Sequence, residues 1–168
     1  KTHTFETALR DLDFSPVHKG EAVVTLTGPF IGETPTAGVA FVGLESGQLM
    51  AHVEFPNCAD ELKIQPGGTL ALLAPTNCRK DPISVIDLAT RTFVKNMPGF
   101  GPVVISEDGK TAVGFTRKAD MVTEWGIDQV MNIGLIIVDL DTLAFELVEY
   151  GDKAPAYVLT PDGDSLFT

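Results

Sequence analysis

Apolar residues occur along the chain in short runs of the kind that form β-strands. Runs of roughly four to eight residues, rich in Val, Ile, Leu, Phe and Thr, are bounded by Gly, Pro and Asp. A helical pattern is weakly present only at residues 4–12 and, more weakly, at residues 118–131. The pattern therefore predicts an all-β protein.

Hairpins of two kinds alternate along the chain. Turns of the first kind contain Pro, Asp or Gly, which supply the fixed or positive φ angles of a tight reversal. They are expected at residues 15–19, 65–68, 106–110 and 160–163. Turns of the second kind are expected at residues 45–47, 89–90 and 141–142. Two successive hairpins give four antiparallel strands, and this unit recurs.

The recurrence is visible in the residues themselves. Residues 84–93 read SVIDLATRTF, and residues 136–145 read IIVDLDTLAF. They match at Asp87 and Asp139, Leu88 and Leu140, Thr90 and Thr142, and Phe93 and Phe145. Each copy precedes a second unit, GPVVISEDGKTAVGF at 101–115 and PAYVLTPDGDSLFT at 155–168. Four strands at a period of roughly 40–55 residues predict a β-propeller.

These units resemble YVTN-type β-propeller repeats, in which a V-I-D-x-x-T hairpin precedes an S-P-D-G-K hairpin. The resemblance covers residues 58–168 well and 14–55 loosely. The aromatic-Val pair that ends the second strand of such repeats is replaced here by Val113, Gly114 and Phe115. Such repeats occur in surface proteins, redox-enzyme subunits and lactonases alike, so the resemblance implies a fold and leaves the ligand open.

The predicted blades span approximately residues 8–55, 58–96 and 101–150, with a half blade at 154–168, in one propeller portion over 1–168. Closed propellers typically need four to eight blades. An open half-ring would also leave unpaired strand edges, which proteins avoid. We therefore expect an incomplete ring, or a fragment of a larger propeller, that is completed by missing blades or by another chain.

Charge and composition narrow the function classes. The net charge is −11, and no Lys/Arg cluster is present to neutralise phosphates, which argues against nucleic acid as a partner. No apolar run approaches the ~18 residues of a membrane span. Known catalytic motifs are missing, and His3, His18 and His52 are scattered. No catalytic residue, metal ligand or cofactor is therefore expected.

The two cysteines favour a disulfide. Cys58 and Cys78 flank a predicted hairpin whose turn contains Gly68, midway between them. Cross-strand partners come close enough for a disulfide after a small adjustment. The alternative is two buried free thiols. A disulfide indicates an oxidising compartment, so we expect a secreted, periplasmic or cell-surface protein.

Two long loops are candidates for binding a protein partner, because long loops in compact domains are usually functional or disordered. Loops 27–37 and 116–133 hold large side chains of types that are common at interfaces: Phe30, Ile31, Met121, Trp125 and Met131. The alternative for Trp125 is that it folds back over the neighbouring blade. Asp87 and Asp139 are expected to accept hydrogen bonds from turn amides.

Two functions remain open. The first is a non-catalytic, protein-binding or structural propeller module of an exported or cell-surface protein, as part of a larger assembly. The alternative is a propeller enzyme or enzyme subunit, lactonase-like or of a periplasmic dehydrogenase, with its site on the loop face or in missing blades. The missing catalytic constellation favours the first.

Overall fold

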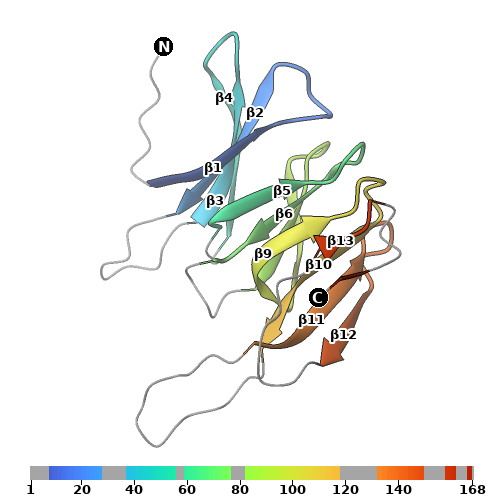
Figure 1. Cartoon of the computed structure of the whole chain (residues 1–168). Coiled ribbons are helices and arrows are strands. Elements are labelled where there is room, and N and C mark those ends of the chain that lie inside the picture. Colours follow the sequence, from blue (N-terminus) through green and yellow to red (C-terminus); the bar gives the residue numbers. More distant parts are fainter. Residues whose placement is uncertain are drawn as a thin grey trace, which may run out of the picture.

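The computed structural model of the chain describes residues 8–27, 37–55, 59–76, 82–117, 132–149, 158–161 and 166–167. These residues form three four-stranded antiparallel sheets and one two-stranded sheet, shown in Figure 1. The sheets are called blades 1 to 4 in chain order. Within blades 1 to 3, each strand pairs with the strand that follows it in the chain.

The strand bounds are as follows. Blade 1 contains β1 (Ala8–Phe14), β2 (Glu21–Thr27), β3 (Ala37–Gly43) and β4 (Leu49–Phe55). Blade 2 contains β5 (Glu61–Ile64), β6 (Leu70–Ala74), β7 (Ile83–Asp87) and β8 (Thr92–Met97). Blade 3 contains β9 (Phe100–Ile105), β10 (Thr111–Arg117), β11 (Asn132–Asp139) and β12 (Phe145–Glu149). Blade 4 contains β13 (Val158–Leu159) and β14 (Leu166–Phe167).

The predicted all-β architecture of four-stranded blades is confirmed. Where the structure describes residues 4–12, their weak helical pattern belongs to a β-strand. β1 begins at Ala8, and its register shifts between Leu9 and Leu12. Such a bulge places an extra residue in one strand. Leu9 and Leu12 therefore face the same side at a spacing of three, which imitates a helical period. Residues 118–131 lie outside the described residues.

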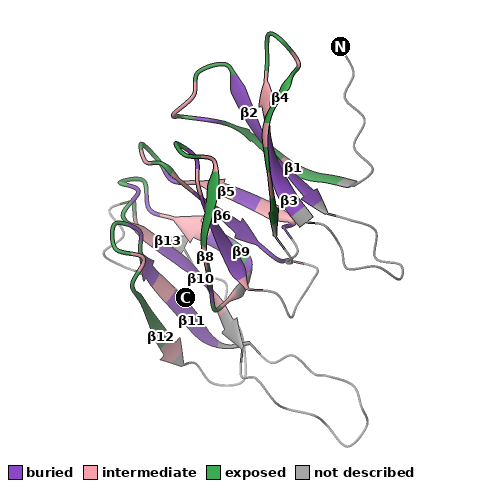
Figure 2. Cartoon of the chain, turned by 180° about the vertical axis from the view of Figure 1, so that it is seen from behind, coloured by how far each residue is buried: buried purple, intermediate pink, exposed green. Residues whose placement is uncertain are grey.

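The blades lie face to face, and the core lies between them. The first strands, β1, β5, β9 and β13, are in contact one after another, as Figure 1 shows. Figure 2 shows that the buried residues concentrate in the two middle strands of each four-stranded sheet, while β1, β4, β8 and β12 are more exposed. The sheets form an arc that is not closed into a ring.

Turn chemistry explains where the strands reverse. The inner turns of blades 2 and 3 contain Gly67 and Gly109, at φ 66° and 72°, which favour glycine. The outer turns instead place Arg91 and Leu143 at φ 54° and 56°, in the left-handed region. These two residues occupy matched positions of the SVIDLATRTF and IIVDLDTLAF units. The sequence repeat is therefore also a repeat of backbone conformation.

Candidate functional site on the blade faces

The seven site residues predicted from the sequence lie outside the described part of the chain. They are the two cysteines and five loop side chains: Cys58, Cys78, Phe30, Ile31, Met121, Trp125 and Met131. Their roles in a disulfide and in partner binding stay predictions. The described residues provide a different candidate site, formed by the faces of the blades.

The predicted turn role of Asp87 and Asp139 is confirmed. The Thr90 amide donates to Asp87 Oδ1 at 2.8 Å. The amides of Asp141 and Thr142 both donate to Asp139 Oδ1 at 2.9 Å. The hydrogen bond from the Thr142 backbone is the main cause that lowers the pKa of Asp139. Both aspartates therefore stabilise outer turns, and the lowered pKa shows that the Asp139 turn favours the charged carboxylate.

Repeated backbone hydrogen bonds define which residues are equivalent between blades. In blades 1 to 3, the amide before the inner turn donates at 2.9 Å to the carbonyl of the first residue of the second strand: Ser15 to Glu21, Gln65 to Leu70, and Ser106 to Thr111. A second set joins the outer turn to the inner turn at 2.7, 2.6 and 2.7 Å: Leu44 to Gly20, Leu88 to Thr69, and Leu140 to Lys110. Glu21, Leu70 and Thr111 are thus equivalent.

The interface between blades 1 and 2 is a hydrophobic core with a charged pair at its edge. Val23, Val39 and Phe41 of blade 1 belong to one buried cluster with residues from the blade 2 side: Ala59, Leu62, Ala71, Leu73, Ile86 and Leu88. All the blade 1 members lie on the face of that sheet turned toward blade 2.

The charged pair joins Glu21 of blade 1 to Arg91 of blade 2. Glu21 is 4% exposed, and its Oε2 accepts from Arg91 Nη2 at 2.8 Å and from Nε at 3.1 Å. The guanidinium carbon also lies 5.9 Å from the centroid of the Phe41 ring, within the range of cation–π attraction. Glu21 Oε1 is buried and accepts no hydrogen bond from the described residues. Arg91 therefore neutralises a carboxylate that is largely removed from water.

The interface between blades 2 and 3 uses the same positions with uncharged residues. Leu70, which is equivalent to Glu21, and Leu143, which is equivalent to Arg91, both pack against one buried cluster. This cluster joins Leu72, Ala74, Ile83, Val85 and Met97 to Val103, Ala112, Ile136, Val138 and Leu140. The outer turn of each blade thus reaches the start of the second strand of the preceding blade.

The free face of blade 1 shows two large apolar side chains that have buried equivalents elsewhere. Leu12 and Phe14 are 54% and 61% exposed. Leu62 and Val103, which stand at the position of Leu12 in blades 2 and 3, are 4% and 2% exposed. Ile64 and Ile105, at the position of Phe14, also pack against the interface clusters. In blades 2 and 3, these positions of the first strand therefore pack against the preceding blade.

Exposed apolar residues on the fourth strands have a different explanation. Leu49, Phe93 and Phe145 are equivalent, since they oppose Val42, Ile86 and Val138 in their sheets. They are 46%, 39% and 43% exposed, whether or not a blade precedes their own. Their exposure belongs to the outer strand, whereas Leu12 and Phe14 are exposed on a face that no described blade covers.

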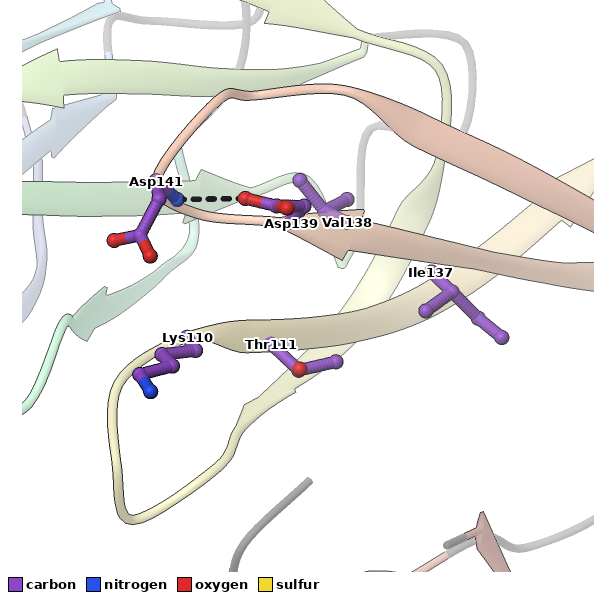
Figure 3. Close-up of a pocket in the computed structure, with 6 residues that line it drawn as sticks. All are labelled: Lys110, Thr111, Ile137, Val138, Asp139 and Asp141. Carbon is purple, nitrogen blue, oxygen red and sulfur yellow. Dashed lines mark hydrogen bonds between the residues drawn. The ribbon is translucent and has the colours of Figure 1, made fainter. Parts of the chain in front are cut away.

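The opposite end of the arc has a hollow on blade 3. Its volume is about 190 Å³, and it is lined by Lys110, Thr111, Ile137, Val138, Asp139 and Asp141. Figure 3 shows the side chains of Thr111 and Ile137 directed to the same side, from neighbouring strands. This hollow lies at the position where blades 1 and 2 receive Arg91 and Leu143.

Within the described ranges, no group of three or more His, Cys, Asp or Glu side chains is placed to hold a metal ion. Among those same residues, no helix has the length and hydropathy needed to cross a bilayer.

The stacked four-stranded blades define the class of protein, an arc of a β-propeller. No protein-family model matches the chain, and no curated protein matches its sequence. Solved structures do match it, and they are propeller domains or proteins that contain comparable sheets.

Three of these structures show the range of the likeness. The β-propeller domain of the trilobed protease from Pyrococcus furiosus has a TM-score of 0.60 and 17% identity, over 98% of this chain and 49% of that one. Hydrazine synthase from Kuenenia stuttgartiensis has a TM-score of 0.55 and 20% identity, over 86% of this chain and 39% of that one. The Pan2 WD40 domain from Neurospora crassa has a TM-score of 0.51 and 12% identity, over 84% of this chain and 40% of that one. This chain spans less than half of each, and the likeness shows the fold alone.

Sequence reasoning missed the Glu21–Arg91 pair and the exposed face of blade 1. The aligned repeats do carry a signal for the pair, because Arg91 stands where the other copy has Leu143. A charged residue at a position that is apolar in the next repeat indicates a charged partner across the interface. Glu21 itself gives no such signal, since an acidic residue at the start of a strand is typical of the surface.

Proposed function

We propose that this chain is a non-catalytic propeller module of an exported or cell-surface protein, and that it binds further blades within a larger assembly. The observation that carries the proposal is the exposure of Leu12 and Phe14 on the free face of blade 1. At the same positions, blades 2 and 3 have residues that pack against a preceding blade. A face with this composition supports a partner that presents another blade.

Covering the free face of blade 1 would stabilise the protein. Burying a Leu or Phe side chain contributes about 1.5–3 kcal/mol. Since 54% of Leu12 and 61% of Phe14 remain exposed, covering both would contribute about 2–3 kcal/mol, which is a sizeable fraction of a typical domain stability. Both side chains belong to the innermost strand, where the first strands of successive blades contact one another.

The test compares the 168-residue chain with the protein as purified from its source. The double substitution Leu12→Ser, Phe14→Ser should cost the isolated chain less than about 1 kcal/mol, because both side chains are exposed there. In the source protein, the same substitution should lower the free energy of unfolding by about 2–3 kcal/mol. Denaturant unfolding of the two materials measures both values.

The matched control is Leu49→Ser, Phe93→Ser, which removes the same kinds of side chain from outer strands. Since these residues are equally exposed with and without a preceding blade, the control should cost less than about 1 kcal/mol in both materials. An equal effect of the Leu12 and Phe14 substitution in both materials would mean that no partner covers this face.

The exported location rests on the cysteine pair. The described ladder pairs Glu61 with Ala74 and Leu62 with Leu73. Cys58 and Cys78 lie outside the described residues and are ten residues before and ten residues after Gly68 of the turn, a symmetric spacing that supports a disulfide between them. An intact mass that rises by two hydrogens on reduction is the expected result. An unchanged mass would remove the support for an oxidising compartment.

A further inference from the structure

The outer strand of blade 3 differs in its pairing from the outer strands of blades 1 and 2. β4 pairs with β3, and β8 with β7, across an irregular step in which Met50 and Val94 are the extra residues. β12 pairs with β11 without such a step over its whole length, Phe145–Glu149. Among the three four-stranded blades that the structure describes, only blade 3 therefore has a regular outer strand.

A bulge in an outer strand protects the edge of its sheet. The extra residue interrupts the ladder and increases the local twist, so another strand cannot easily pair along that edge. In β8, Lys95 follows the bulge directly, and a lysine on an edge strand has the same protective effect. β12 has neither the bulge nor a lysine. Its edge therefore keeps the regular geometry that an added strand requires.

The backbone groups at the outer edge of β12 follow from the turn that precedes it. The Asp139 amide donates to the Ala144 carbonyl at 2.9 Å. Hydrogen-bonded and non-hydrogen-bonded pairs alternate along an antiparallel ladder, so the backbone of Glu146 is directed toward β11. The amides and carbonyls of Phe145 and Leu147 are then directed away from β11, toward an edge that no described strand covers (Figure 2).

The side chains of the same two residues make this edge apolar. Phe145 and Leu147 are 43% and 53% exposed, and they share one face because side chains alternate along a strand. His52 and Asn96 are equivalent to Leu147, since each opposes the residue four places before the leucine that bonds to the inner turn. This position is therefore polar in blades 1 and 2 and apolar in blade 3.

The charges around β12 favour a basic partner. Glu146 is exposed between the two apolar residues, and Asp141 is exposed in the turn before the strand. The ammonium of Lys95, on the neighbouring blade, already donates to the Leu143 carbonyl at 3.0 Å. A second copy of this chain would bring another Glu146 and another net charge of −11 to the same edge, which is unfavourable. A segment with Lys or Arg opposite Glu146 is favoured instead.

We propose that the outer edge of β12 binds an extended segment of a basic protein partner, which adds to the sheet of blade 3 as a further strand. The backbone of the segment pairs with Phe145 and Leu147, its apolar side chains cover these two residues, and a Lys or Arg lies beside Glu146. The inference goes beyond the proposed function, because this partner binds an outer edge and supplies no blade.

Selection from a random twelve-residue peptide library displayed on phage tests the proposal. The target is the protein expressed from its complete gene, and a soluble Leu147→Pro variant is the competitor. Proline at this position removes an amide directed away from β11, so the sheet should remain folded. We expect enriched peptides in which apolar residues alternate with Lys or Arg. They should bind the Leu147→Pro variant more than about tenfold more weakly, because main-chain hydrogen bonds are lost.

Two further variants separate the charge of the edge from its general stickiness. Glu146→Lys keeps the strand and reverses its charge, so the selected peptides should bind about fivefold more weakly. Phe93→Ser removes an exposed aromatic residue from the bulged strand β8, and binding should not change. If Leu147→Pro does not fold by circular dichroism, Glu146→Lys replaces it as the competitor, with the same expected enrichment.

Amide hydrogen exchange shows where a selected peptide binds. The peptide should slow exchange at Phe145 and Leu147 and leave exchange at Phe93 unchanged. The proposal is overturned by no enrichment over the competitor, by enriched peptides without basic residues, or by equal binding to Glu146→Lys. Protection that is absent from Phe145 and Leu147 also overturns it. So does a homodimer that the Leu147→Pro variant dissociates in sedimentation, because the occupant would then be a second copy of this chain.

Discussion

Replacing Arg91 with alanine is expected to lower the free energy of unfolding of the chain by about 3 kcal/mol. The substitution removes the cationic partner of the Glu21 carboxylate, which is 4% exposed in the native chain and lies between two blades. The cost of breaking a buried pair from one side is typically about 3–5 kcal/mol. Arg91 keeps 27% exposure, so water can reach the site and the lower value applies. Urea unfolding measures the change.

The double substitution Glu21→Leu, Arg91→Leu tests whether the interface between blades 1 and 2 requires the two charges or only side chains that pack at these positions. It copies the Leu70 and Leu143 combination of the next interface, which packs without charges. Replacing a buried ion pair by apolar residues is often neutral or stabilising. The double variant should therefore unfold within about 1 kcal/mol of the native chain.

Two controls complete this experiment. Lys63→Ala removes a surface pair with Glu61, and it should cost less than about 1 kcal/mol because such pairs contribute little. A double leucine variant as unstable as Arg91→Ala would contradict the equivalence of the two interfaces. It would also contradict the description of the hollow on blade 3 as the position at which blades 1 and 2 receive Arg91 and Leu143.

Replacing Gly99 with alanine is expected to destabilise the chain by about 3–5 kcal/mol, since strain and overlap act together. Gly99 lies between β8 and β9 at φ 131°, a region that side chains rarely adopt. Its new Cβ would lie 2.8 Å from Ile83 Cδ1, 2.9 Å from the Phe115 carbonyl oxygen and 3.1 Å from Ile136 Cγ2. These neighbours belong to both blades 2 and 3, so neither side can move away without opening the interface.

The matched control is Gly67→Ala. Gly67 also has a positive φ, 66°, but nothing lies within 4 Å of an added Cβ. Only the backbone cost of about 1–2 kcal/mol should remain. Guanidinium unfolding of the two variants gives both values, and an equal loss in the two would mean that the contact between blades 2 and 3 at Gly99 is loose.

Strand order and turn positions could be read from the sequence because they depend on local patterns. The repeated Asp-x-x-Thr unit predicted the turns at Asp87 and Asp139, and the hydrogen bonds there are as expected. The bulge between Leu9 and Leu12 could not be predicted in the same way. A single inserted residue changes the apolar period from two to three over a short strand, and this resembles a helix.

The candidate site could not be predicted, because it depends on how the blades stack. Leu12 and Val103 are both ordinary strand residues in the sequence, and only the tertiary arrangement makes one exposed and the other buried. The burial of Glu21 likewise requires the neighbouring outer turn. The sequence nevertheless predicted that the ring is open, and an open ring must have two free blade faces.

The most direct test of the central claim is hydroxyl-radical footprinting of Leu12 and Phe14 in the protein purified from its source, compared with the 168-residue chain. Phe93 serves as the internal reference, because its exposure does not depend on a preceding blade. We expect Leu12 and Phe14 to be protected in the source protein to the level of Leu62 and Val103, while Phe93 reacts equally in both. Equal reactivity of Leu12 and Phe14 in the two materials would contradict the claim that further blades cover this arc.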